Sequence, residues 1–124
     1  MAGPANPSDP LADAVAERIA DTMFALSTPS RLQILVCLRS APRTVSEIVE
    51  AVGMEQSAVS HQLRVLRDHS VVSMRRLGRR RQYALRDEHI GALIDSALEH
   101  VRALEPATND GVDRGGSAAR STAS

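Results

Sequence analysis

The sequence of 124 residues contains no lysine and no tryptophan, and it has one cysteine, one tyrosine and one phenylalanine. A single cysteine, Cys37, excludes an intrachain disulfide. No apolar run approaches the ~20 residues that a helix needs to cross a bilayer. The N-terminus has no basic region followed by an apolar core, so no signal peptide is predicted. These absences favour a cytoplasmic protein.

Signs of enzymatic chemistry are absent as well. The sequence has no Gly-rich phosphate loop and no pair of candidate catalytic carboxylates, and the chain is too small to enclose a substrate. Residues 1–10 carry three prolines, and residues 105–124 hold almost no large apolar side chain. We therefore expect a non-enzymatic domain at 11–104, with disordered tails at 1–10 and 105–124.

Apolar residues at helical spacing predict a first helix over 11–26, a buried second helix over 29–39 and a long last helix over 88–104. Thr44-Val-Ser-Glu47 has the form of a capping box, and it opens a third helix that ends at Gly53. A fourth helix is predicted over 56–68. Strands at 71–74 and 82–85, with Gly78 between them, predict a hairpin. The fold class is mainly α with a small β-hairpin: five helices, which include a helix-turn-helix, plus a two-stranded wing that precedes the last helix.

Charge is balanced overall, with 15 basic and 15 acidic residues, but it is unevenly distributed. The segment from His61 to Arg86 has one acid, Asp68, against eight arginines. A basic stripe confined to one segment is typical of nucleic-acid binders, although such a run can also be a solvated surface. The arginines are Arg64, Arg67, Arg75, Arg76, Arg79, Arg80, Arg81 and Arg86.

The fourth helix has the side chains that a DNA-reading helix needs. Short polar groups near its start suit base edges, and cations further along suit phosphates. The wing arginines Arg79, Arg80 and Arg81 suit phosphates or a narrow minor groove. The sequence therefore predicts binding to double-stranded DNA through the wing and through Gln56, Ser57, Ser60, His61, Gln62, Arg64 and Arg67.

The string at 53–67, Gly-Met-Glu-Gln-Ser-Ala-Val-Ser-His-Gln-Leu-Arg-Val-Leu-Arg, resembles the recognition helix of the ArsR/SmtB (arsenic-repressor) family of metal-responsive regulators. It looks most like the nickel/cobalt-sensing branch. Residues 26–32 resemble that family's entry to its second helix, and residues 78–85 resemble its wing. The resemblance covers about residues 11–104. It implies a winged-helix homodimer, joined through the first and last helices, that usually represses by covering an operator until an effector binds.

The last helix contains a candidate metal site. His89 and His100 share a face but lie ~16 Å apart along one helix, so only an antiparallel copy across a two-fold axis can bring both to one ion. The resemblance implies a site of Asp-x-His, a distal histidine and a fourth histidine or glutamate. Asp87, His89 and His100 match, whereas Ala103 departs from the pattern, so water, Glu99, Glu105 or Asp110 would have to complete the site. Oxygen and nitrogen ligands suit zinc, nickel or cobalt, and the resemblance favours nickel or cobalt.

Two alternatives remain open for this region. Asp87 also suits a helix N-cap, and the histidines also suit a polar dimer seam. Ala103 favours a family member that has lost metal sensing and acts independently of metal or under a protein co-regulator. A thiol switch is not expected, because the position of the family's thiolate pair holds Thr44-Val45-Ser46 and Cys37 is expected to be a buried small hydrophobe.

Overall fold

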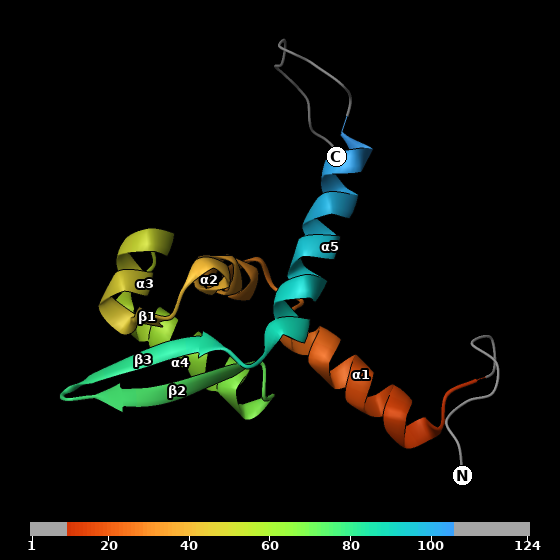
Figure 1. Cartoon of the computed structure of the whole chain (residues 1–124), viewed down its shortest axis with the longest axis horizontal. Coiled ribbons are helices and arrows are strands. Elements are labelled where there is room, and N and C mark those ends of the chain that lie inside the picture. Colours follow the sequence, from red (N-terminus) through yellow and green to blue (C-terminus); the bar gives the residue numbers. More distant parts are fainter. Residues whose placement is uncertain (1–9, 106–124) are drawn as a thin grey trace. The chain divides into compact units, whose positions relative to one another are not determined.

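The computed structural model describes residues 10–105, which belong to two compact units that divide between Gly91 and Ala92. The first unit holds four helices, three strands and the start of α5, and the described part of the second is the remainder of α5 (Figure 1). Most of both predicted tails lies outside the described residues. Within 10–105 no helix is long and apolar enough to cross a membrane. The elements are α1 (Asp13–Ala25), α2 (Pro29–Ser40), β1 (Arg43–Thr44), α3 (Val45–Val52), α4 (Gln56–Asp68), β2 (Val72–Leu77), β3 (Arg80–Leu85) and α5 (Glu88–Leu104).

The helix ends follow from local chemistry. Thr28 caps α2 by accepting a hydrogen bond from the backbone N–H of Arg31, and Pro29 occupies the first turn, where its missing N–H costs nothing. Thr44 and Glu47 form both bonds of the predicted capping box at α3. Gly53 ends α3 with φ 72°, a left-handed conformation that glycine adopts without a steric penalty. All five predicted helices are therefore present.

The sheet has one strand more than the sequence predicted. The hairpin strands β2 and β3 are longer than expected and pair antiparallel from Val72–Leu85 to Leu77–Arg80. The short β1 pairs with the other edge of β3, with Arg43 opposite Tyr83, which gives the order β1-β3-β2. Two residues are too few to show an alternating pattern, so sequence periodicity gives no sign of β1.

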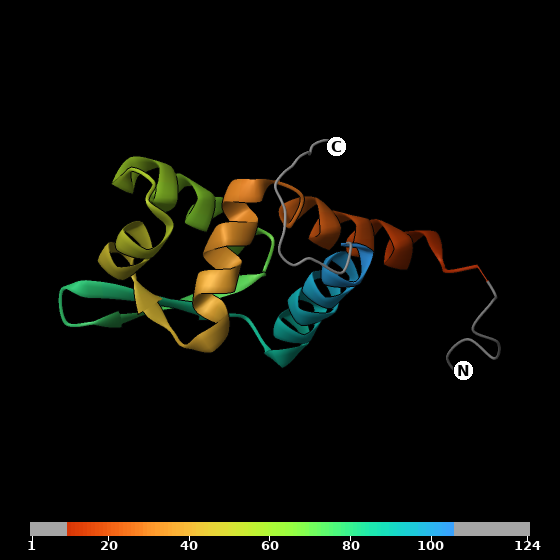
Figure 2. The same ribbon diagram turned by 90° about the horizontal axis from the view of Figure 1, so that it is seen from above.

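The core of the first unit lies among α2, α3, α4 and the sheet. Its fully buried side chains come from all of them: Ile34, Leu35, Ile48, Val59, Leu63, Leu66, Val71 and Val72. Figure 2 shows α2 between α1 on one side and α3 with α4 on the other.

One expectation about α2 is wrong. The sequence predicts a buried helix over 29–39, but two of its apolar side chains, Leu32 and Val36, are exposed. An amphipathic helix buries one stripe with a period of about 3.6 residues, and here that stripe contains Arg31, Leu35 and Leu38. Cys37 is half-buried, so it is less enclosed than predicted.

Candidate nucleic-acid interface and metal site

The recognition-helix candidate α4 separates an apolar side from a polar side. Val59, Leu63 and Leu66 are fully buried and fix the helix against the core. Six of the seven predicted DNA-contacting side chains on this helix are exposed, which leaves their hydrogen-bonding groups accessible to a ligand. They are Gln56, Ser57, Ser60, His61, Arg64 and Arg67.

Gln62 differs from these six side chains. It is half-buried, and its Oε1 accepts a hydrogen bond from Arg31 Nη1 at 3.2 Å. Ser60 and Arg64 each lie two residues from Gln62, and residues two apart on a helix do not share a face. The structure therefore separates Gln62 from the exposed polar side.

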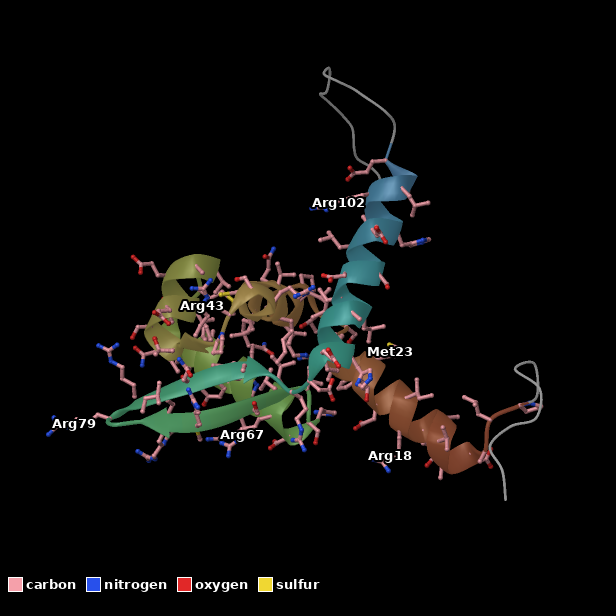
Figure 3. All side chains as sticks on the ribbon, viewed as in Figure 1. Arg18, Met23, Arg43, Arg67, Arg79 and Arg102 are labelled. Atoms are coloured by element: carbon pink, nitrogen blue, oxygen red, sulfur yellow. The ribbon has the colours of Figure 1, made fainter. Side chains whose placement is uncertain are left out.

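The wing presents its arginines on a two-residue loop and on the strands beside it. Arg79 lies at the tip of the hairpin (Figure 3), next to Gly78, whose φ of 63° suits glycine in a tight loop. Arg80 and Arg81 lie on β3 and are exposed.

The strand register adds an arginine that the sequence-based site did not include. Arg76 on β2 lies directly opposite Arg81 on β3, and both are exposed. Like charges opposite each other destabilise a strand pair, and a phosphate between them would relieve the repulsion. The sequence signal for Arg76 was its place in the basic run, but its partner follows only from the hairpin register.

Glu47, in the first turn of α3, has a lowered carboxyl pKa, and one cause is the charge of a wing arginine. The largest cause is the backbone N–H of Thr44, which donates to the Glu47 carboxylate at 2.9 Å. The side-chain hydroxyl of Thr44 and the positive charges of Arg43 and Arg80 lower this pKa further. Glu47 therefore stays ionised at neutral pH, and it serves as a cap in the helix-turn-helix.

The first turn of α5 brings two predicted metal ligands together. Asp87 Oδ1 accepts hydrogen bonds from the backbone N–H groups of His89 at 3.0 Å and Ile90 at 3.2 Å, so the predicted N-cap role is real. The same oxygen lies 3.7 Å from His89 Nδ1, and the imidazole is 89% exposed. The carboxylate has a second oxygen that takes no part in these bonds, so a carboxylate and an imidazole are both available to an ion here.

The described part of a single chain does not complete a metal site. No group of three histidine, cysteine, aspartate or glutamate side chains within 10–105 is placed to hold an ion. His100, Glu99 and Ala103 lie further along α5 and are exposed, and Asp110 is outside the described residues. The donors at Asp87 and His89 fit a divalent transition metal in kind, but further ligands have to come from elsewhere.

Comparison with known proteins identifies the family. The arsR family of bacterial regulatory proteins matches residues 28–73. The HTH-type transcriptional regulator NmtR of Mycobacterium tuberculosis is 49% identical over 104 residues, which cover 84% of this chain and 87% of that protein. The chain belongs to the ArsR family. Its fold and its non-enzymatic class, both predicted from the sequence, are thereby confirmed, and this ArsR-family protein is a transcription regulator.

Two further ArsR-family comparisons extend the match. A transcriptional repressor SmtB homolog of Synechocystis is 37% identical over 87 residues, which cover 70% of this chain and 66% of that protein. The solution structure of a homodimeric winged helix-turn-helix DNA-binding domain from Mycobacterium bovis superposes with a TM-score of 0.65 at 33% identity. It covers 83% of this chain and 90% of that one.

Proposed function

We propose that this ArsR-family protein is a homodimeric operator-binding repressor that acts in the cytoplasm, and that a divalent transition metal lowers its affinity for DNA. The observation that carries the DNA-binding part is the pairing, within one compact unit, of an exposed polar side on α4 with an arginine-rich hairpin. The repressor and homodimer assignments draw support from the Synechocystis repressor and from the homodimeric M. bovis domain.

The two DNA-facing elements have different roles in this proposal. The polar side chains of α4 donate to and accept from base edges, which sets sequence preference. The arginines of the wing neutralise phosphates, which sets overall affinity and its salt dependence. The proposed contacts are Gln56, Ser57, Ser60, His61, Arg64, Arg67, Arg79, Arg80 and Arg81, to which the strand register adds Arg76.

The dimer proposal is supported by an apolar stripe on α1. Leu11 precedes the helix. Val15, Ile19 and Met23 lie on the helix at four-residue intervals, so these three residues share one face. All four side chains are between 44% and 52% exposed in the single chain. Late α5 also exposes large apolar side chains, namely Leu98, Val101 and Leu104. Such surface is favourable to bury against a second copy.

The proposed metal site uses Asp87 and His89 from one subunit and His100 from the other. Binding would tie the two subunits into one relative orientation. If that orientation spaces the recognition helices wrongly, metal and DNA must each weaken the binding of the other by the same factor. Nickel or cobalt is favoured over zinc by the resemblance of residues 53–67 to the nickel/cobalt-sensing branch.

A metal-independent regulator under the control of a protein partner is the second candidate. Ala103 favours it, because an alanine stands where the family's metal sites have a fourth ligand.

Both candidates are tested by one titration. The operator is first selected by the wild-type protein from a randomised double-stranded DNA library. Its affinity is then measured by fluorescence anisotropy across Ni²⁺, Co²⁺ and Zn²⁺, with His89→Ala as the matched variant. Metal-weakened binding that disappears in His89→Ala supports the metal-responsive repressor. Operator binding that ignores all three metals favours the metal-independent regulator, and failure to select any sequence contradicts both.

A further inference from the structure

A buried arginine joins the end of α1 to the recognition helix. Arg31, in the first turn of α2, is only 7% exposed. Its Nε donates to the carbonyl oxygen of Ala25 at 2.6 Å, and its Nη2 donates to that of Phe24 at 3.1 Å. Both carbonyls belong to the last turn of α1, where the regular i to i+4 hydrogen bonds end. The Phe24 carbonyl also accepts from the backbone N–H of Ser27 at 3.0 Å and from the Ser27 hydroxyl at 2.7 Å. The guanidinium therefore acts as a C-terminal cap for α1.

The third nitrogen of the same guanidinium binds α4. Arg31 Nη1 donates to Gln62 Oε1 at 3.2 Å. A guanidinium has only donors, so the Gln62 atom that faces it must be the carboxamide oxygen. With that oxygen engaged, Gln62 cannot form the bidentate pair with adenine, which requires the oxygen and the nitrogen together.

Gln62 also points to a different side of α4 from the DNA-facing residues. Successive helical residues are separated by ~100° around the axis. Ser60 and Arg64 are each two residues from Gln62, which places both of them about 160° away from it. Gln62 therefore serves an internal contact.

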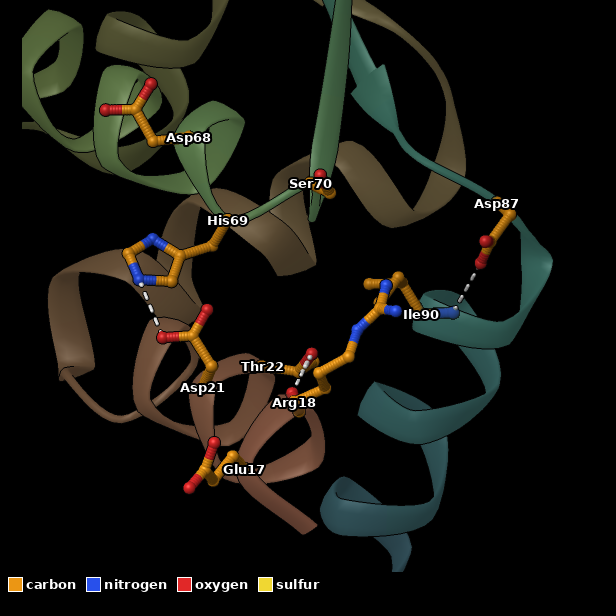
Figure 4. A pocket seen from close by; sticks show the side chains of 9 residues that line it. All are labelled: Glu17, Arg18, Asp21, Thr22, Asp68, His69, Ser70, Asp87 and Ile90. Atoms are coloured by element: carbon orange, nitrogen blue, oxygen red, sulfur yellow. Dashed lines mark hydrogen bonds and ion pairs between the residues drawn. The ribbon is translucent and has the colours of Figure 1, made fainter. Parts of the chain in front are cut away.

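A second contact, which does not involve Arg31, links the same two helices. Asp21 Oδ1, on α1, lies 3.4 Å from Nε2 of His69, the residue that follows α4 (Figure 4). His69 Nδ1 is 2.9 Å from the carbonyl oxygen of Val65 on α4, which fixes the ring to that helix. Phe24 lies between the two ties, with its ring centroid 6.0 Å from that of His69 and 5.7 Å from the Arg31 guanidinium carbon.

We propose that Arg31 is a positioning residue for operator recognition: it holds α4 against the end of α1 by binding Gln62, which is an anchor point and not a base-reading residue. This inference rests on the proposed function, because α1 carries the apolar stripe assigned to the dimer interface. Through the hydrogen bonds of Arg31, the position of α1 in the dimer then determines the orientation of each recognition helix.

Two substitutions at Gln62 separate an anchor from a DNA contact. Gln62→Met keeps the length of the side chain and removes the acceptor. Gln62→Glu keeps an acceptor for Arg31, as a charge-assisted bond, but places a negative charge on α4. The same pair at Gln56, on the exposed polar side, is the matched control. Affinities for the library-selected operator and for a scrambled duplex are measured by anisotropy, and the free energy of unfolding is measured for each variant.

If Gln62 is an anchor for α4, Gln62→Met should weaken operator binding by about tenfold, which is the usual scale for a coupled contact. Binding to the scrambled duplex should stay unchanged. Gln62→Glu should return operator affinity to within about threefold of wild type, because its charge lies away from the DNA. At Gln56 the order reverses, with Gln56→Glu the weaker binder because its carboxylate lies on the side of α4 proposed to face the negatively charged duplex.

Arg31 is tested through Gln62, since its removal alone risks unfolding the chain. Arg31→Lys keeps a cation for the α1 carbonyls but replaces the three guanidinium nitrogens, each of which makes its own bond, with one ammonium nitrogen. It should weaken operator binding when Gln62 is present and add little in the Gln62→Met background.

Three results would overturn the inference. One is a Gln62→Glu variant that binds operator more weakly than Gln62→Met, which would make Gln62 a DNA contact. Another is operator affinity that is unchanged in Gln62→Met, or that falls only in step with the free energy of unfolding. The third is an equal effect of Arg31→Lys in both backgrounds. A wild-type protein that selects no operator would instead contradict the proposed function, and the inference with it.

Discussion

Ile19 offers a direct test of how the subunits associate. It lies in the middle of the apolar stripe on α1 and is 44% exposed in the single chain. Complete burial of an isoleucine is worth about 1.5–3 kcal/mol, so covering the part that remains exposed is worth about 1 kcal/mol. Two-fold symmetry counts the contact twice, which gives about 2 kcal/mol, or about a 30-fold change in the dimer dissociation constant.

Ile19→Ala should therefore raise the dimer dissociation constant by about 30-fold while the monomer stays folded. Sedimentation velocity over a concentration series measures the constant, and circular dichroism checks the fold. Glu17→Ala is the control, because Glu17 lies two residues away and so on another side of α1. The reasoning is refuted if Ile19→Ala dissociates at the same concentration as wild type, or if Glu17→Ala weakens the dimer equally.

Three other predictions concern DNA, metal and pH. Arg79→Ala should weaken binding to all duplexes alike and reduce the salt slope by about one, whereas Ser60→Ala should relax sequence preference by about 1–3 kcal/mol at one position; anisotropy at several salt concentrations distinguishes the two outcomes. Ala103→His should tighten metal binding and His100→Ala should abolish it, and calorimetry that finds both variants equal to wild type would place the site elsewhere. The folded-state pKa of Glu47 lies below its unfolded value, so its contribution to stability is present above the unfolded pKa and is lost as pH falls through the folded pKa. Glu47→Gln should therefore flatten the acid limb of a thermal-unfolding profile, and a limb of unchanged steepness would argue against this linkage.

The helices were predictable because each carries its own local signals. The capping box at Thr44, the left-handed stop at Gly53 and the Asp87 cap are all written within a few neighbouring residues, and all three appear in the structure. The strand β1 was not predictable, because its pairing with β3 depends on residues about 40 positions away.

The candidate site was predictable in part for the same reason. Exposure on α4 follows from helical periodicity, which placed Ser60 and Arg64 correctly on the polar side. The engagement of Gln62 by Arg31 depends on a contact between residues 31 positions apart. Periodicity alone gives no sign of such a contact, and the same holds for the pairing of Arg76 with Arg81 across the hairpin.

The Asp87 carboxylate has a consequence for experiments on α5. Its Oδ1 holds the amide hydrogens of both His89 and Ile90, so the first turn of the helix is secured by one side chain. The solvent-exchange rates of these two amides therefore report directly on how firmly that oxygen is engaged. A ligand that draws the Asp87 carboxylate away would release these two amides. Their exchange with solvent would then become faster before any change in the rest of the helix.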